Sequence, residues 1–473
     1  MNEPAIRFGT DGWRAVIGDE FTFANVRACA QATALYVKRA GLAARGLVVG
    51  YDTRFASEDF AAAVAEVLAA NGVPVYLCDR PAPTPVVGYS ILDREAGGSV
   101  VITASHNPAQ YSGFKVRTEY AGSAPPEILS QIEALIRPGE EPPRLPLKEA
   151  KAKGLVETFD PRRAYLKHLS TLVDLGELRS AGLRVAVDSM HGAGAGYVRA
   201  LLAGGKTRVH EIRSARNPSF PRMHNPEPIA RNLGPLREAV KRGGAQVGLA
   251  TDGDADRLGV IDGQGRFVNQ LQTFALLAYY LLEVRGLRGP MVKSVTTTGM
   301  VPKLGKLYGV PVHETAVGFK YLGPKMRESD AIIAGEESGG YAFRGHLPER
   351  DGILSGLYFL DLMARRRKEV PALIAELFDK VGPHYYDRID IEMSAPERAE
   401  VEPRLDSLRP ESIAGLAITN VDRTDGLRFT LGDGAWALIR LSGTEPLMRI
   451  YTEVPREELV PAVLRECREL TGV

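Results

Sequence analysis

The chain has 473 residues, a formal net charge of +1 and a pI near 7.7. This balance of charge gives no electrostatic reason to expect a nucleic acid or a membrane surface as a partner, so an anion would be bound locally. Because a domain usually has roughly 100–200 residues, the length predicts about three or four domains.

The spacing of the cysteines and the length of the apolar runs indicate the cellular compartment of the protein. Cys29, Cys78 and Cys467 lie far apart, lack the spacing of metal ligands and leave one thiol unpaired in any disulfide scheme. The first residues contain no basic and apolar leader, and no run approaches the roughly 18–20 apolar residues of a membrane span. We expect a cytoplasmic protein without a nucleic-acid or membrane partner, and the sequence leaves its oligomeric state open.

Short apolar runs alternate with longer helical stretches, a pattern that predicts parallel sheets covered by helices and therefore an α/β fold. Buried strands are expected at residues 47–50, 100–102, 183–187, 247–250 and 331–334. Polar residues follow each run, beginning with Asp52-Thr53-Arg54 after the first. Reactive groups of open α/β sheets lie at the carboxyl ends of strands, so these polar segments are the candidate site.

Proline, glycine and charged residues indicate where domains end. Residues 137–143 are charged and Pro-rich, which predicts a connection closing the first domain. Gly263-Gln264-Gly265 predicts a hairpin turn near the second boundary, and alternating strand patterns after Gly382-Pro383 predict a smaller α+β domain. The expected domains cover residues 1–150, 151–258, 259–378 and 379–473.

The segment Thr103-Ala104-Ser105-His106-Asn107-Pro108, which we call the serine loop, follows the apolar run 99–102. A strand pattern that runs into polar residues and a proline predicts Ser105 on an exposed loop, beside the imidazole of His106. Ser105 is therefore a candidate nucleophile. His106 could assist it, or could be only a hydrogen-bonding residue that shapes the loop.

Residues 252–257, the aspartate loop, place Asp252, Asp254 and Asp256 two residues apart. In a locally extended loop these side chains would point the same way, and three adjacent carboxylates would repel without a cation such as Mg²⁺. An EF-hand is excluded because the sixth position is Arg257 and the twelfth is Gly263. A solvated acidic turn remains an alternative. Haloacid-type phosphatases also use paired aspartates, but as the nucleophile, and here a serine is available.

Two further segments carry groups that suit a sugar phosphate. Residues 335–340, the glutamate loop, present Glu336 and Ser338 on a glycine-rich turn, where they could bond to vicinal hydroxyls or simply start a helix. The segment 440–446 and the nearby Arg449 combine arginines, hydroxyls and a glycine turn, which is either a phosphate cradle or an ordinary β-turn. Additional candidates near these pockets are Arg14, Lys115, Lys320, His346 and Arg350.

All these stretches, in this order from Phe8 to Tyr451, resemble the α-D-phosphohexomutases, the family of phosphoglucomutase and phosphomannomutase. The resemblance implies four domains around a central cleft: three related mixed α/β domains and a last α+β domain of a TATA-binding-like type. It implies that Ser105 carries a phosphoryl group, and that Mg²⁺ is held against it by Asp252, Asp254 and Asp256. It also implies that Glu336 and Ser338 grip sugar hydroxyls. The groups expected to hold the non-reacting phosphate are Arg440, Ser442, Gly443, Thr444 and Arg449.

Moving a phosphate between the 1- and 6-positions of a hexose is nearly thermoneutral, so the reaction needs only a phosphoryl donor that is regenerated. Phosphorylated Ser105 would give its group to the sugar, and the hexose 1,6-bisphosphate would reorient and return the other. Arg14, Arg257 and Mg²⁺ would offset the negative charge. Lys115 is the candidate general acid/base and His106 the supporting group; a lysine base needs a lowered pKa, which nearby cations could supply.

The sugar is harder to predict. Bifunctional phosphomannomutase/phosphoglucomutases end the glutamate loop with histidine, where this chain has Gly340, and phosphoglucosamine mutases typically differ at the place of Glu337. The resemblance therefore favours glucose, then mannose, then glucosamine.

A hydrolase is disfavoured because no Gly-x-Ser-x-Gly elbow surrounds Ser105. A catalytically silent sugar-phosphate sensor would not need Ser105, Lys115 and all three aspartates together.

Overall fold

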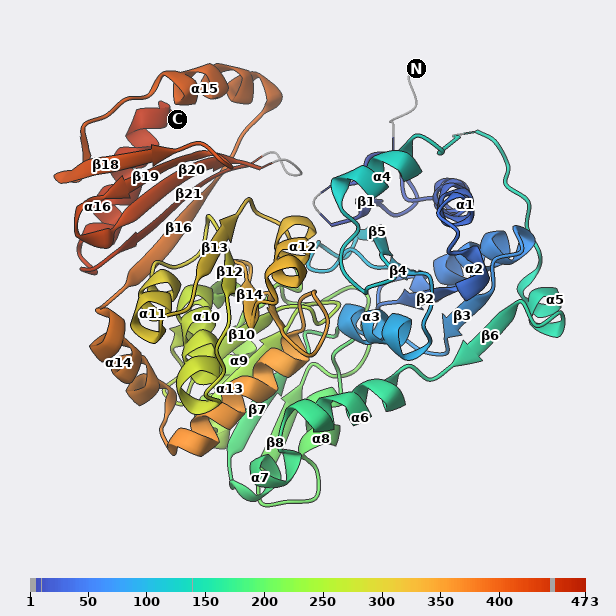
Figure 1. Cartoon of the computed structure of the whole chain (residues 1–473), viewed down its shortest axis with the longest axis horizontal. Helices are drawn as coiled ribbons and strands as arrows, with labels where there is room; N and C mark the ends of the chain where they lie inside the picture. The colour runs from blue at the N-terminus through green and yellow to red at the C-terminus, as the bar shows by residue number, and fades with distance from the viewer. Residues whose placement is uncertain (1–5, 10, 138, 443–446) are drawn as a thin grey trace.

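The structure is a computed structural model that describes residues 6–9, 11–137, 139–442 and 447–473. These residues form four sheets, each with its own helices, and Figure 1 shows the last sheet beside the third, far from the first. Most buried apolar side chains of the first three units make one connected core that runs from Ile6 to Val381, and smaller clusters lie in the second and third units. The last unit has a separate core from Met393 to Cys467.

The first sheet brings two predicted polar segments together. Its strands are β1 (Trp13–Val16), β5 (Tyr111–Arg117), β4 (Ser99–Ile102), β2 (Leu47–Tyr51), β3 (Val75–Cys78) and β6 (Val156–Phe159), in that spatial order. Its helices are α1 (Phe23–Arg39), η1 (Ala43–Arg45), α2 (Ser57–Ala70), α3 (Thr84–Asp93), α4 (Pro126–Glu133) and α5 (Leu147–Ala152). β2 and β4 are parallel neighbours and fully buried, as continuous apolar runs predict. Their carboxyl ends therefore place Asp52 beside the serine loop.

The second unit carries the aspartate loop as a hairpin connection. Its sheet has the order β11 (Phe267–Val268), β10 (Leu258–Asp262), β9 (Val247–Thr251), β7 (Arg184–Asp188) and β8 (Arg208–Ile212). The helices are α6 (Arg162–Leu172), α7 (Leu175–Ser180), α8 (Tyr197–Leu202), η2 (Ala230–Asn232) and α9 (Gly234–Gly243). β9 and β10 are antiparallel, so the chain must reverse direction between them. The turn predicted at residues 263–265 joins β10 to β11, which confirms it.

The glutamate loop is likewise a hairpin connection in the third unit. The sheet order is β13 (Val312–Thr315), β12 (Met291–Ser294), β14 (Ile333–Gly335) and β15 (Tyr341–Phe343), and β14 and β15 are antiparallel. The helices are α10 (Gln270–Tyr279), the π-helix η3 (Tyr280–Val284), α11 (Met300–Tyr308), α12 (Phe319–Ser329), α13 (Gly352–Arg366) and α14 (Val370–Val381). Asp351 caps α13 by accepting the backbone N–H groups of Ile353 and Leu354.

The last unit is an antiparallel sheet with two helices of eight residues or more. Its order is β16 (Tyr385–Glu392), β21 (Leu447–Val454), β20 (Trp436–Leu441), β19 (Leu427–Leu431), β18 (Leu416–Asp422) and β17 (Ser412–Ile413). The helices are α15 (Ala395–Ser407), η4 (Gly432–Gly434) and α16 (Leu459–Thr471). The mixed α/β class of the chain, with a distinct C-terminal domain, is confirmed.

Three strands lie at or past the domain ends that the sequence suggested. β6 follows residue 150 but pairs with β3 at the edge of the first sheet. β10 begins at residue 258 but pairs with β9 of the second sheet, and β11 completes that sheet at its edge. The boundaries at residues 150, 258 and 378 remain predictions. Within the described residues, no helix is both long and apolar enough to span a bilayer.

Candidate functional site

Ser105 lies at the end of β4 and faces the second unit. Its Oγ donates a hydrogen bond to Asp252 Oδ2 at 2.8 Å and lies 3.3 Å from His106 Nδ1. The exposed position predicted for Ser105 is wrong, because the residue is only 1% exposed. The aspartate loop covers it so closely that a Cβ at Gly253 would lie 2.4 Å from the carbonyl oxygen of Ser105.

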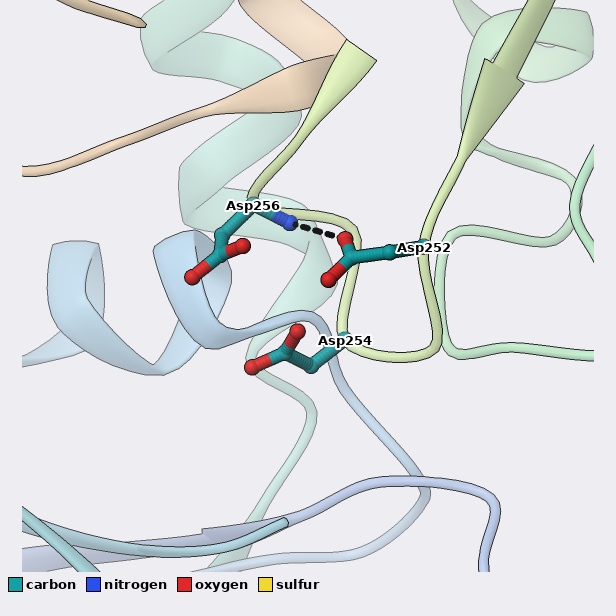
Figure 2. A group of neighbouring side chains, drawn as sticks. All are labelled: Asp252, Asp254 and Asp256. Carbon is teal, nitrogen blue, oxygen red and sulfur yellow. Dashed lines mark hydrogen bonds between the residues drawn. The ribbon is translucent and has the colours of Figure 1, made fainter. Parts of the chain in front are cut away.

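The three aspartates of the aspartate loop converge on one point (Figure 2). One carboxylate oxygen from each lies within 4.8 Å of the others, so the prediction of a convergent triad is confirmed. The loop is a turn with Ala255 at φ 56°, and not the extended segment we expected. It turns because β9 and β10 are antiparallel, and Asp252 Oδ1 stabilises the turn by accepting the N–H groups of Asp256 and Arg257.

The electrostatics of this triad suit a cation. Burial and the charges of Asp254 and Asp256 raise the pKa of Asp252 well above its usual value. Burial also raises the pKa of Asp256, whereas at Asp254 burial is outweighed by the Lys115 ammonium, which lowers the pKa. Asp254 Oδ1 and Asp256 Oδ1 are buried and accept no hydrogen bond from the residues that the structure describes. Such oxygens are the ligands that a hard divalent cation prefers, so the triad could hold Mg²⁺.

Lys115 reaches the same point from β5. Its fully buried ammonium lies 2.8 Å from Asp11 Oδ2, 2.9 Å from Asp254 Oδ2 and 3.8 Å from Asp256 Oδ2. The sequence predicted cations near Lys115, but its ammonium contacts carboxylates. Carboxylates from the first and second units surround it, because the aspartate loop packs directly on β5.

Arginines lie around the serine loop. Arg14 donates to Asn107 Oδ1 at 2.7 Å, and Arg257 pairs with Glu227 at 3.2 Å. Burial, with Arg257 and Arg14 adding to it, lowers the pKa of His106 well below its usual value. The imidazole beside Ser105 is therefore neutral at neutral pH and retains an acceptor nitrogen.

Arg350 links the glutamate loop to the aspartate loop and to Asp11 of the first unit. Its guanidinium lies 2.6 Å from Asp11, 3.0 Å from Asp256 and 3.6 Å from Glu336. Burial raises the pKa of Glu336, and the charge of Arg350 opposes that rise. Ser338 Oγ donates to Glu336 Oε2 at 3.2 Å, so the two expected sugar-binding groups lie together.

His346 forms hydrogen bonds away from the glutamate loop, whereas Lys320 is partly exposed to solvent. The sequence placed His346 within reach of the glutamate loop, but its ring nitrogens bond to His168 at 3.0 Å and to Asp351 at 2.8 Å. The bond to His168 joins the third unit to the second, whereas the bond to Asp351 stays within the third unit. Lys320 is half-buried at the start of α12, over the ring of Tyr321.

The remaining phosphate candidates that the structure describes lie on or next to the paired strands β20 and β21. Arg440 donates to Asp425 Oδ1 at 2.8 Å, and Arg449 Nε lies 3.6 Å from Asp390. Ser442 is buried just after β20. The two other residues expected in this cradle, Gly443 and Thr444, lie outside the described residues.

Sequence reasoning assigned no role to two residues that contact the site. Asp11 accepts bonds from Lys115, Arg117 and Arg350 and thereby joins the first unit to the third. Its place in the glycine-flanked segment that contains Arg14 was the available signal. Thr84, at the start of α3, donates to Asp254 Oδ2 at 2.6 Å. Nothing in its local sequence distinguishes it from an ordinary first residue of a helix.

Comparison with known domain families covers most of the chain. Four segments match domains described under the heading phosphoglucomutase/phosphomannomutase. They are alpha/beta/alpha domain I at residues 5–142, alpha/beta/alpha domain II at 163–265, alpha/beta/alpha domain III at 269–381, and the C-terminal domain at 395–470.

Similar proteins match over nearly their whole length. A phosphoglucomutase/phosphomannomutase of Thermococcus kodakarensis is 32% identical, and the match covers 95% of each chain. A phosphoglucosamine mutase of Leifsonia xyli subsp. xyli is also 32% identical, with 98% of each chain covered. A crystal structure from Thermus thermophilus, provisionally named a phosphomannomutase, is 37% identical with a TM-score of 0.87, covering 99% of this chain and 100% of that one.

Proposed function

Because the chain belongs to the phosphoglucomutase/phosphomannomutase family and is a phosphohexomutase, an intramolecular phosphotransferase, we propose that it interconverts glucose 1-phosphate and glucose 6-phosphate through phosphorylated Ser105. The observation that carries the proposal is the placement of Ser105 Oγ 2.8 Å from Asp252 Oδ2, at the edge of three converging carboxylates. A phosphoryl group on this oxygen would lie at the place where a divalent cation is best bound.

We propose that Asp252, Asp254 and Asp256 hold Mg²⁺ there, with Ser105 or its phosphoryl group as a further ligand. The oxygens of Asp254 and Asp256 that lack a hydrogen bond among the described residues support this fit. The ion would neutralise the phosphoryl oxygens during transfer. Arg14 and Arg257, which flank the serine loop, would add positive charge from this chain's own side chains.

The proposed reaction consists of two transfers at one serine. In the first, the bond between phosphorus and Ser105 Oγ breaks as phosphorus bonds to the free hydroxyl of the sugar phosphate; the proton of that hydroxyl passes to a base, and Ser105 Oγ takes up a proton. In the second, the hexose 1,6-bisphosphate has reoriented and returns its other phosphoryl group to Ser105 Oγ; the serine proton passes to a base, and the freed sugar oxygen takes up a proton. Lys115 is the proposed general acid/base, and His106, neutral and 3.3 Å from Ser105 Oγ, supports it.

Substrate binding is assigned to residues of the third and fourth units. Glu336 and Ser338 would bind sugar hydroxyls, with Arg350 and Lys320 nearby, whereas the contacts of His346 argue for a structural role at this position. Arg440, Ser442 and Arg449, with Gly443 and Thr444, would hold the non-reacting phosphate. The order glucose, mannose, glucosamine remains a proposal, since relatives carry all three substrate names.

The test is a rate assay on glucose 1-phosphate, mannose 1-phosphate and glucosamine 1-phosphate, with Mg²⁺ and a trace of the matching hexose 1,6-bisphosphate. We expect 6-phosphate from glucose 1-phosphate with the highest kcat/KM, and no product after chelation of the metal. A higher kcat/KM with mannose or glucosamine would reassign the substrate. Release of inorganic phosphate would contradict the mutase, as would binding of all three sugars without turnover.

A further inference from the structure

Arg54 follows β2 in the polar segment Asp52-Thr53-Arg54, which the proposed reaction does not use. Because β2 and β4 are parallel neighbours, this segment lies against the serine loop. The Arg54 side chain is fully buried, and its guanidinium donates to the Asp52 carboxylate and to backbone oxygens rather than to Ser105 Oγ. Its contact with the reacting serine is therefore made through the backbone.

The guanidinium of Arg54 donates to four backbone carbonyls of the segment that begins at Ser105. Nη2 donates to the oxygen of Ser105 at 2.7 Å and of Asn107 at 2.6 Å. Nη1 donates to the oxygen of Pro108 at 2.8 Å and of Tyr111 at 3.0 Å. Only a planar fork of fixed N–H groups can satisfy so many acceptors at once, and a lysine ammonium has neither the number nor the geometry.

Asp52 extends this support to the N–H group of Ser105. Its Oδ2 accepts from Arg54 Nε at 3.1 Å and from Thr103 Oγ1 at 2.6 Å. Thr103 Oγ1 in turn accepts from the N–H group of Ser105 at 2.8 Å. The pair of Asp52 and Arg54 therefore holds Ser105 at both of its backbone polar groups, the N–H through Thr103 and the carbonyl directly.

Ser105 needs such support because its φ is 51°, in the left-handed region that residues with a Cβ disfavour. A residue persists in this conformation only where its surroundings determine it. The conformation sets the direction of Cβ and Oγ, and here Oγ points at Asp252. We propose that Arg54 is a positioning residue for phosphoryl transfer: through the backbone of the serine loop it aims Ser105 Oγ at the aspartate triad. This inference rests on the proposed function.

If Arg54 positions Ser105, its replacement should lower the rate of phosphoryl transfer much more than the affinity for ligands. Phosphoryl transfer depends mostly on alignment, and a displacement of the reacting atom by about 1 Å costs roughly 100-fold in rate. The phosphate cradle lies on the fourth unit, so the affinity for the sugar phosphate does not depend on the serine loop. Three of the expected Mg²⁺ ligands lie on the second unit, so the affinity for Mg²⁺ depends on the serine loop only through Ser105. A residue with only a general structural role would lower stability, binding and rate together.

The test compares Arg54→Lys with Arg216→Gln. Arg216 is the matched control, since it donates to the oxygens of Thr53 and Arg54 at 2.9 Å and pairs with Glu58, all of which lie outside the serine loop. The single-turnover rate from phosphorylated enzyme to sugar phosphate is measured together with Tm and with the Kd values for Mg²⁺ and glucose 1-phosphate. We expect Arg54→Lys to lose about 100-fold in rate, with the Kd for glucose 1-phosphate within about threefold and the Kd for Mg²⁺ changed far less than the rate. We expect Arg216→Gln to match the wild type.

Thr103 provides a second test should Arg54→Lys fail to fold. Thr103→Val removes the link between Asp52 and the N–H of Ser105, and Thr103→Ser retains it. We expect a loss of about tenfold in transfer rate for the valine variant, as for one lost hydrogen bond, and recovery for the serine variant. An unchanged transfer rate in Arg54→Lys, or in Thr103→Val, would overturn the proposal, and so would a loss of Mg²⁺ and sugar-phosphate binding equal to the loss of rate. A wild-type enzyme that is never phosphorylated by hexose 1,6-bisphosphate would instead overturn the proposed function.

Discussion

Several side chains at this site form hydrogen bonds or ion pairs with a residue of another unit. Ser105 Oγ from the first unit donates to Asp252 in the second, and Asp11 in the first accepts from Arg350 in the third. Buried charges are costly unless each has a partner, so these cross-contacts hold the loops together as well as placing reactive groups.

Replacing Ser105 with alanine tests the residue that carries the chemistry. We expect Ser105→Ala to lower turnover by at least about 1,000-fold, because the phosphoryl carrier is removed, while the Kd for glucose 1-phosphate stays within about threefold. Rate assays and calorimetric titration measure the two effects. Ser112→Ala is a matched control, because Ser112 is a buried serine of the same sheet whose Oγ has no hydrogen-bond partner among the described residues. Mutase activity retained by Ser105→Ala would remove Ser105 from the mechanism.

At the scale of elements, the site residues lie in loops that follow or connect strands. The serine loop follows β4, the aspartate loop joins β9 to β10, and the glutamate loop joins β14 to β15. Their close approach depends on glycine where two backbones touch. Gly253 is such a position, since a Cβ there would lie 2.4 Å from the oxygen of Ser105.

Gly253→Ala should therefore separate the two loops. The methyl group cannot be accommodated without moving the backbone of Ser105 or the aspartate loop, and a shift of about 1 Å predicts a loss of roughly 100-fold in kcat. Gly234→Ala, at the start of α9 with no atom within 4 Å of the added carbon, is the control and should stay near wild-type activity. Steady-state kinetics of both variants check this. Equal activity of the two variants would mean that the contact does not align the loops.

At the scale of the whole molecule, the last unit touches the glutamate loop directly. Glu337, between Glu336 and Ser338, accepts a hydrogen bond from Tyr386 at 2.7 Å and pairs with Arg388 at 2.9 Å. Tyr386 and Arg388 lie on β16 of the last sheet (Figure 1). The hydrogen bond of Tyr386 and the ion pair of Arg388 therefore help to fix the phosphate cradle relative to the glutamate loop.

Arg388→Gln tests this tie. A partly buried charged hydrogen bond contributes about 1.5–3 kcal/mol, so we expect the KM for glucose 1-phosphate to rise by roughly tenfold, with a small change in Tm. Arg428→Gln removes another ion pair between the third and fourth units, with Glu314 at 2.8 Å, away from the glutamate loop. Its KM should change less than about twofold. The same change of KM in both variants would show a general weakening of the junction.

Local patterns of residues are enough to locate the segments that carry the chemistry. Ser105, the aspartate triad and Glu336 with Ser338 each occupy a pattern of apolar strand followed by polar turn, and such patterns depend on neighbouring residues alone. The five expected strands and the separate C-terminal domain were predictable for the same reason.

How these segments meet could not be predicted in the same way. Ser105 is covered by a loop whose first aspartate lies 147 positions later in the chain, Lys115 is surrounded by carboxylates from two units, and His346 is turned toward His168. Arg54 acquires its contacts because β2 and β4 pair in parallel. Each of these contacts joins residues far apart in sequence, and their geometry is set by the packing of whole sheets, which no local pattern of residues encodes.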